Sequence, residues 1–193
     1  MLLEDLLSGY PRKLQLKTGF CCSARPLKAR DEEALYKFFL AVPEQERMFS
    51  KRRITDQTVV HEWCRTIDYD HNLPLLAVLG GRIIGVATLH QQQGGWKRHI
   101  GRVNVLVHPE YRGRGLARAL IGELVEIARH IGLEKVEAEF TADQEHGIQV
   151  FALLGFSELL RLPNYVRDMQ ADRHDYVLMG LDLVTDEEYA GAG

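Results

Sequence analysis

Short runs of apolar residues divide the chain into segments that predict strands. The clearest are two β-rich runs joined by Gly80-Gly81, a dipeptide that favours a tight hairpin turn. Near the start of the chain, a turn at residues 17–19 separates two alternating segments and predicts a hairpin or a bent strand. The predicted strands lie within residues 14–27, 73–90, 100–107, 135–141, 156–166 and 174–183.

Between these runs the apolar residues recur at helical spacing. The longest such segment runs from Gly115 to Ile131, and Gly132 is well placed to end it. Asp31 is predicted to cap another helix, because two acidic residues follow it in the first turn. The predicted helices cover residues 1–9, 31–42, 56–66, 115–131 and 144–154.

The order of these elements is strand, two helices, three antiparallel strands, a long helix, a strand, a helix and two strands. Such an order predicts an α/β or α+β fold in which helices cover both faces of a mixed sheet. The 193 residues suffice for one domain with a proper core and are few for two. We therefore expect an N-terminal extension over residues 1–13, a single domain over 14–183 and a frayed tail over 184–193.

Composition is that of an ordinary globular protein, so any basic site must be local. Hydrophobic residues make up 46% and charged residues 26%, and the formal net charge of −3 gives no global reason to bind nucleic acid. Glu4 and Asp5 occupy the place where a signal peptide carries positive charge, and no apolar run approaches about 18 residues. We expect a cytoplasmic protein with no membrane span and no nucleic-acid partner.

The three cysteines indicate neither a disulfide framework nor a metal site. Cys21, Cys22 and Cys64 lack CxxC spacing, and the adjacent pair would point to opposite faces of a strand. We interpret all three as reduced structural thiols and predict no bound metal.

The segment VHPEYRGRGLARAL, residues 107–120, is the strongest chemical signal in the sequence. Pro109 fixes its own φ and should end the preceding strand. Gly113 and Gly115 allow close backbone approach, and the helix that follows leaves its first amides without internal partners at the positive end of its dipole. With two arginines beside the glycines, these features predict an anion cradle. A plain loop with solvated arginines is the alternative.

The spacing of the glycines excludes two common phosphate loops. The Walker pattern GxxxxGK[ST] is absent, and the dinucleotide pattern GxGxxG is incomplete because Arg118 stands where its third glycine would be. What remains is a pyrophosphate held mainly by backbone amides, without a lysine or a metal ligand. A nucleotide or phosphosugar binder is a rival interpretation of the same cradle.

The cradle resembles the signature Q/R-x-x-G-x-G/A of the GNAT acetyltransferases. The matching residues are Arg112, Gly113, Arg114, Gly115, Leu116 and Ala117. FALLGF, residues 151–156, is similar to the Y-x-x-x-G-F of that family, and the element order over residues 14–183 also resembles the family. Residues 16–39 and 163–181 resemble, more distantly, the acetyltransferase domains that modify protein lysines.

This resemblance implies a mixed, mostly antiparallel sheet with splayed central strands, and acetyl-CoA as the co-substrate. In the family, the loop amides bind the pyrophosphate, a bulge separates the two central strands, and a backbone amide polarises the thioester carbonyl. The residues so implied in cofactor binding are Val105, Leu106, Val107, Arg112, Gly113, Arg114, Gly115, Leu116, Ala117, Gln144 and Phe151.

The family's acid and base do not carry over to this sequence. Acetyl transfer to an amine needs a neutral nucleophile, a stabilised oxyanion and a protonated leaving thiolate. The tyrosine that commonly protonates the thiolate aligns with Phe151, which has no proton to give. A carboxylate often found on the central strand aligns with Arg102.

Three explanations for these substitutions stay open. The thiolate can leave unassisted or through water, because a thiol pKa of about 8.5 makes it a fair leaving group. Tyr165 can act as the donor instead, with His90, His99 or Asn104 orienting a water as base, although solvated or structural roles are the alternative for each. Otherwise the domain is a non-catalytic acyl-CoA-binding sensor.

The sequence therefore predicts an N-acetyltransferase that moves the acetyl group of acetyl-CoA directly to a primary amine of a small molecule or a protein. The basic run at residues 51–53 lies where the family places acceptor-binding elements, and a solvated surface is the alternative for it. Glu137 and Glu139 are expected on a solvated or salt-bridged strand face. Exposed strand edges near the C-terminus can pair two subunits in a homodimer.

Overall fold

A computed structural model describes residues 3–16, 19–47 and 54–183 of the chain. The basic run at residues 51–53 and the tail predicted over 184–193 lie outside these described residues.

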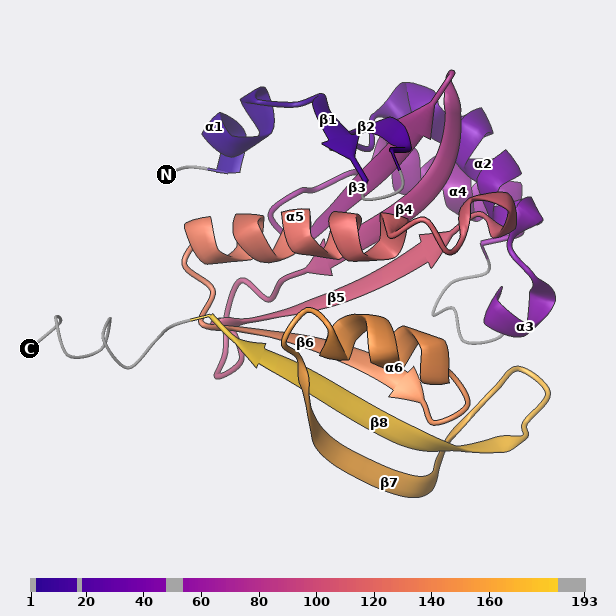
Figure 1. Cartoon of the computed structure of the whole chain (residues 1–193), viewed down its shortest axis with the longest axis vertical. Coiled ribbons are helices and arrows are strands. Elements are labelled where there is room, and N and C mark those ends of the chain that lie inside the picture. Colours follow the sequence, from indigo (N-terminus) through magenta and orange to yellow (C-terminus); the bar gives the residue numbers. More distant parts are fainter. Residues whose placement is uncertain (1–2, 17–18, 48–53, 184–193) are drawn as a thin grey trace, which may run out of the picture.

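Within the described residues, eight strands form one sheet in the order β1-β2-β3-β4-β5-β6-β8-β7 (Figure 1). Only β5 and β6 pair in parallel, and the other neighbours are antiparallel. This mixed, mostly antiparallel sheet confirms the predicted fold class. The strands are β1 (Arg12–Gln15), β2 (Cys21–Pro26), β3 (Asn72–Leu79), β4 (Arg82–His90), β5 (Ile100–Val107), β6 (Lys135–Thr141), β7 (Ser157–Arg167) and β8 (Arg173–Asp182).

Helices cover both faces of the sheet, as predicted. Helices α5 (Leu116–His130) and α6 (Glu145–Ala152) lie on one face, and α2 (Glu32–Ala41) and α4 (Gln57–Arg65) lie on the other (Figure 1). One apolar core fills the space under α5 and α6, and a second lies under α2 and α4. The remaining helical segments are α1 (Leu3–Ser8), η1 (Ala29–Asp31), α3 (Glu44–Arg47) and η2 (Pro109–Tyr111).

The predicted hairpin at Gly80-Gly81 is present and joins β3 to β4. Both glycines have positive φ, +55° at Gly80 and +80° at Gly81, which is the requirement of a two-residue type I′ turn. The turn sets the register of the two central antiparallel strands, in which Leu79 pairs with Arg82.

Asp31 contributes to the start of α2 in a different way from the predicted cap. Its side chain makes no capping hydrogen bond to the helix and instead accepts from both terminal nitrogens of Arg25, at 2.6 and 2.7 Å, and from the Lys28 amide at 2.8 Å. Burial alone would raise the pKa of Asp31, but the bonds from Arg25 and Lys28 outweigh it and lower the pKa. This buried carboxylate fastens α2 to the end of β2.

The first residues of the chain pack with the rest of the domain. Leu6 is buried, and Leu3 and Leu7 pack against the core under α5. The hydroxyl of Tyr10 donates to Glu123 on α5 at 2.8 Å. Residues 3–15 thus add a helix and an edge strand to the fold.

Candidate functional site

A gap opens in the sheet between its two parallel strands. Strands β5 and β6 pair only at their first residues, where Ile100, Gly101 and Arg102 face residues 135–137. Beyond these three pairs the strands diverge (Figure 1). The predicted splay is therefore confirmed.

The gap forms without the bulge that the family resemblance implied. The register between β4 and β5 is continuous from Gly85 opposite Val107 to His90 opposite Arg102, so β5 carries no extra residue against β4. In a regular antiparallel ladder of this kind the strands stay paired along their whole length. The separation thus comes from β6 turning away from β5, and the prediction of a bulge is wrong.

Backbone amides of β5 point into this gap. The His108 amide donates to the Ile84 carbonyl on the β4 side at 2.9 Å. Because amide direction alternates along an antiparallel ladder, the Leu106 amide also points to β4, whereas those of Val105 and Val107 point to the gap. Of the three residues predicted to offer a donor, two therefore have the required direction.

The loop after β5 has the geometry expected of an anion cradle. Gly113 and Gly115 have φ of +72° and +81°, a left-handed conformation that favours glycine. A Cβ added at Gly115 would meet no atom within 4 Å, so this side of the loop is open. Helix α5 makes its first bond from Ala119 to the Gly115 carbonyl, so the amides of residues 116–118 precede the bonded turns.

The two arginines of the loop have partners within the protein. Arg112 forms an ion pair with Glu46 on α3 at 2.7 Å, and its Nε donates to the Val107 carbonyl at 3.3 Å. Arg114 lies over aromatic rings, with its guanidinium carbon 4.9 Å from the centroid of Phe20. Arg112 thus connects the loop to α3, a segment far away in the sequence.

Gln144 and Phe151 make structural contacts beyond the gap. The Gln144 side chain accepts from the Thr141 amide at 2.9 Å at the end of β6. Phe151 is 1% exposed and packs edge-on against Phe140 and Phe156, with centroids 5.0 Å apart in both pairs. The ring that replaces the family's tyrosine is therefore part of the core.

Polar side chains cross the sheet on the face of α2 and α4, beginning with three residues from β3, β4 and β5. His90 Nδ1 lies 2.6 Å from Asn72 Oδ1, and His90 Nε2 lies 3.1 Å from Asn104 Nδ2. Because an amide oxygen only accepts, Nδ1 carries the ring proton, and Nε2 holds the lone pair toward Asn104. The structure therefore brings together two of the predicted base candidates and orients one of them.

The same face continues across the gap as an ion pair and a tyrosine. Arg102 lies opposite His90 in the ladder, and its Nη1 is 3.2 Å from Glu139 on β6. The hydroxyl of Tyr176 on β8 donates to Glu139 at 3.0 Å. Burial, together with the charge of Glu139, raises the pKa of Tyr176 to about 12. Tyr165, which is 66% exposed, lies beside Tyr176 with ring centroids 5.6 Å apart.

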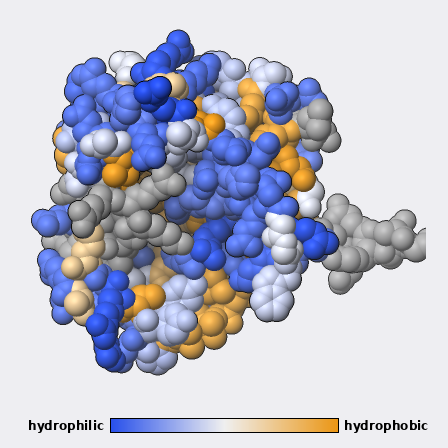
Figure 2. All heavy atoms as spheres, turned by 180° about the vertical axis from the view of Figure 1, so that it is seen from behind, coloured by the Kyte–Doolittle hydropathy of each residue, from blue (hydrophilic) through white to orange (hydrophobic). Residues whose placement is uncertain are grey.

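These side chains form two bonded groups that meet where His90 lies opposite Arg102 in the ladder, and together they are called the polar row below. Figure 2 shows the molecule from behind, where hydrophilic residues cover much of the middle. The members of the polar row are Asn72, His90, Asn104, Arg102, Glu139 and Tyr176.

The row also accounts for other residues singled out in the sequence. The family's carboxylate aligned with Arg102, and the carboxylate of Glu139, on the neighbouring strand β6, lies against that arginine. Glu139 and Glu137 are salt-bridged as predicted, and Glu137 is also buried, 3.8 Å from Lys97. His99 contributes its backbone carbonyl, which accepts from the Glu134 amide at 2.9 Å.

Three residues of the site were not predicted, namely Asn72, Tyr176 and Glu46. Alternation in the last strand would have placed Tyr176 on one of its two faces, but only the pairing of β6 with β8 brings it to Glu139. Asn72 and Glu46 left no signal in the sequence, because their partners come from distant segments.

The described residues also bear on metal sites, membrane spans and reactive thiols. Among these residues there is no cluster of three or more His, Cys, Asp or Glu side chains that could hold a metal, and no helix long and apolar enough to cross a membrane. All three cysteines are free, and burial raises the pKa of the Cys64 thiol to about 11, as suits a structural thiol. The cytoplasmic location stays a prediction.

Comparison with known proteins gives a consistent picture. The model of the acetyltransferase (GNAT) family matches residues 33–156, more than half of the chain. Among solved structures, the GNAT domain of S. lividans PAT is 22% identical, with a TM-score of 0.73 over 89% of this chain and 96% of that one. The yncA protein of Salmonella typhimurium, solved with acetyl-CoA, is 20% identical, with a TM-score of 0.71 over 85% and 95%. A ribosomal-protein-alanine N-acetyltransferase from Brucella melitensis is 22% identical, with a TM-score of 0.70 over 82% and 98%.

Proposed function

Because the chain belongs to the acetyltransferase (GNAT) family, we propose that it transfers the acetyl group of acetyl-CoA directly to a primary amine. The observation that carries this proposal is the gap between β5 and β6, which ends at an open loop of left-handed glycines. A nucleotide or phosphosugar binder would need the loop alone. The gap is what a long, narrow pantetheine arm requires in addition.

The residues present fit acetyl-CoA along this path. Amides of residues 116–118, at the start of α5, would hold the pyrophosphate, with Arg112 and Arg114 adding charge at the edge. Val105 and Val107 have amides directed into the gap, where either can stabilise a developing oxyanion. Acetyl-CoA supplies an acetyl group activated as a thioester.

We propose His90 as the group that accepts the proton of the amine, directly or through a water. Its Nε2 carries the lone pair, and Asn72 fixes this tautomer through Nδ1. Asn104, which contacts Nε2 at 3.1 Å, is exposed and can give way to an acceptor or a water. This division gives His90 the basic role and Asn104 a positioning role.

The leaving thiolate needs little help in this site. A thiol has a pKa of about 8.5, so it leaves readily even without an acid. Tyr176, with its pKa near 12, holds its proton more tightly than the thiolate would, so it is better suited to orient Glu139. Tyr165 is the remaining donor candidate, and its exposure suits a residue that meets the acceptor.

The acceptor is proposed only as a class, a primary amine of a small molecule or of a protein. The Brucella melitensis structure belongs to an enzyme named for a protein acceptor, and its similarity supports including proteins in that class. The polar row offers both charges, from Arg102 and Glu139, so it does not favour an acidic over a basic neighbour of the amine.

The proposal is tested by incubating the protein with acetyl-CoA and a panel of amines and lysine or N-terminal peptides. We expect release of free CoA together with a mass increase of one acetyl group on some acceptors. Acetyl-CoA binding by calorimetry without turnover across the panel would favour the non-catalytic sensor. If acetyl-CoA does not bind at millimolar concentration, the proposed function is wrong.

We also propose that β7 pairs two subunits. It forms one of the two edges of the sheet, and Leu159 and Leu160 on it are 46% and 43% exposed. Exposed apolar edge strands favour pairing with another chain. Light scattering that gives the mass of a monomer at micromolar concentration would contradict this.

A further inference from the structure

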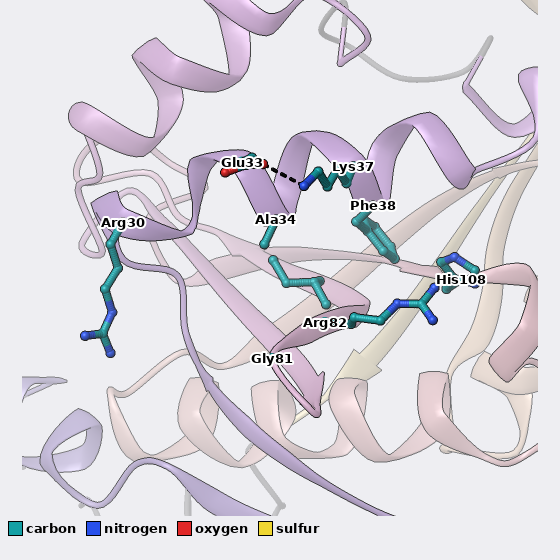
Figure 3. A pocket seen from close by; sticks show the side chains of 9 residues that line it. Arg30, Glu33, Ala34, Lys37, Phe38, Gly81, Arg82 and His108 are labelled. Carbon is teal, nitrogen blue, oxygen red and sulfur yellow. Dashed lines mark hydrogen bonds and ion pairs between the residues drawn. The ribbon is translucent and has the colours of Figure 1, made fainter.

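A cavity lies on the face of the sheet that α2 covers. It has a volume of about 340 Å³ and opens between α2, the Gly80-Gly81 hairpin and His108. Figure 3 shows Glu33 and Lys37 side by side on α2, and Arg82 extending from β4 toward His108. This volume falls at the lower end of the range of small-molecule sites, roughly 300–1,000 Å³.

The lining of this cavity is apolar at its base. Phe38 and Ile83 are 2% and 4% exposed, and Ala34 lies beside them on α2. The Phe38 ring is 6.4 Å from the ring of His108. A flat or short apolar group of a ligand would contact these side chains from several sides.

The rim of the cavity is cationic. Arg30, Lys37 and Arg82 line it, against one carboxylate, Glu33. Lys37 is paired with Glu33 at 2.6 Å, and Arg82 with Glu110 at 3.7 Å, but all four side chains are at least 61% exposed. Exposed pairs of this kind contribute little, so both cations can turn to a ligand at small cost.

His108 adds a donor to these cations. Its Nδ1 accepts from the Glu110 amide at 3.3 Å, so the neutral ring carries its proton on Nε2. The residue is 9% exposed and lines the cavity. Cations, a donor and an apolar base together match one chemical class.

We propose that this cavity binds a small organic carboxylate with an apolar body, at a site separate from that of acetyl-CoA. The apolar base argues against inorganic phosphate, and the cationic rim argues against an amine of the same shape. The cavity lies against α2 and the start of β4, whereas the gap lies between β5 and β6. The cavity residue closest in sequence to the proposed site is His108, which follows Val107 and is four residues from Asn104, about 13 Å along β5 at 3.3 Å per residue. The first turn of α5, proposed to hold the pyrophosphate, lies on the opposite face of the sheet from α2 (Figure 1).

The test is a fluorine NMR titration of the full chain with 4-fluorobenzoate, with and without saturating CoA. We expect saturable binding with a Kd of about 1 mM, typical of so small a ligand, and this Kd should be unchanged by CoA. Arg82→Gln should weaken binding about tenfold, through loss of one charge-assisted contact. The control Arg98→Gln removes the same charge from an exposed loop residue and should have no effect.

Two further ligands define the class. Benzylamine and inorganic phosphate, tested by competition, should each displace 4-fluorobenzoate at least tenfold less well than benzoate does. Displacement by CoA would overturn the proposal by assigning the ligand to the cofactor path. Equal competition by phosphate or benzylamine, equal effects of the two arginine variants, or no saturation would overturn it as well. None of these outcomes depends on whether the protein acetylates an amine.

Discussion

At the end of β5 the candidate site offers backbone groups, whereas across the middle of the sheet it offers side chains. The first part, proposed to bind acetyl-CoA and called the cofactor half, consists of the Val105 and Val107 amides, the loop with Gly113 and Gly115, and the first turn of α5. The second part, proposed to meet the acceptor and called the acceptor half, is the polar row, whose members come from β3, β4, β5, β6 and β8.

The difference between the two halves lies in what each tolerates. Backbone donors survive most substitutions, as long as the glycines permit the conformation and the strands stay apart. The polar row depends on the identity and the register of every member. The same fold can therefore keep its cofactor while it changes its acceptor.

The cofactor half should be broken most severely by Gly115→Glu. The new carboxylate would fill the open side of the loop and repel the pyrophosphate, so we expect acetyl-CoA affinity to fall at least about 100-fold. A non-glycine residue at φ +81° also costs of the order of 1 kcal/mol in stability, which the fold should survive. Calorimetry measures the affinity, and circular dichroism checks the fold.

Two matched variants separate charge from strain. Gly115→Ala carries the strain alone, and Gly122→Glu places the same charge on α5 where a Cβ meets no atom within 4 Å. Both should bind acetyl-CoA within about threefold of the parent protein. Equal losses in Gly122→Glu and Gly115→Glu would remove the loop from the cofactor path.

The acceptor half should respond to His90→Gln with loss of turnover and no loss of cofactor. We expect kcat to fall about 10- to 100-fold, at the lower end for a general base because water can substitute, while acetyl-CoA affinity stays unchanged. His99→Gln is the control, since the contact described for His99 uses its backbone carbonyl. Steady-state kinetics with any acceptor found in the panel measures kcat for both variants. An unchanged kcat in His90→Gln would dismiss His90 as the base.

Substitution of Phe151 tests whether this ring contributes to acetyl-CoA binding or only to the core. As a core residue, Phe151→Leu should destabilise the fold by about 1–2 kcal/mol, below the 3–5 kcal/mol typical of Phe→Ala, with acetyl-CoA affinity within about twofold. Phe156 packs against Phe151, so Phe156→Leu should cause a similar loss of stability and a similarly small change in acetyl-CoA affinity. Denaturant unfolding and calorimetry give the two quantities. A selective loss of affinity in Phe151→Leu would return this ring to the cofactor path.

The sequence predicted the backbone of the cofactor half far better than the side-chain contacts of the acceptor half. Residues 100–107 and 135–141 form strands with the predicted limits, and the loop glycines have the expected conformation, because strand patterns and glycine requirements are local. The pairing of Arg102 with Glu139 depends on parallel register, and Arg112 meets Glu46 across 66 positions of sequence. The prediction of a bulge in β5 was wrong, because the divergence of β6 from β5 alone opens the gap.

The contact between Arg112 and Glu46 joins the cofactor loop to α3, and Glu46→Gln should sharpen its role. The carboxylate competes with the pyrophosphate for Arg112, so its removal should raise acetyl-CoA affinity. The gain should be only about three- to fivefold, because the two side chains are 40% and 36% exposed. Glu44→Gln on the same helix is the control. A lower affinity in Glu46→Gln would show that the pair instead holds the loop in its binding conformation.

The smallest expected effect concerns His174, which lies on β8 two residues before Tyr176 of the polar row. His174 on β8 lies between Asp143, at 2.7 Å, and Asp168, at 3.0 Å, and hydrogen bonds to these carboxylates raise its pKa. Because the pKa in the folded state exceeds the unfolded value of about 6.5, the stabilisation is complete below that pH. This stabilisation is lost as the pH rises through the pKa of His174 in the folded state.

The melting temperature of His174→Gln should therefore fall furthest below that of the parent protein near pH 6 and approach it toward pH 9. His130→Gln, whose ring contacts a backbone carbonyl, should show no such trend, and a pH-independent difference for His174→Gln would mean that its packing matters more than its charge.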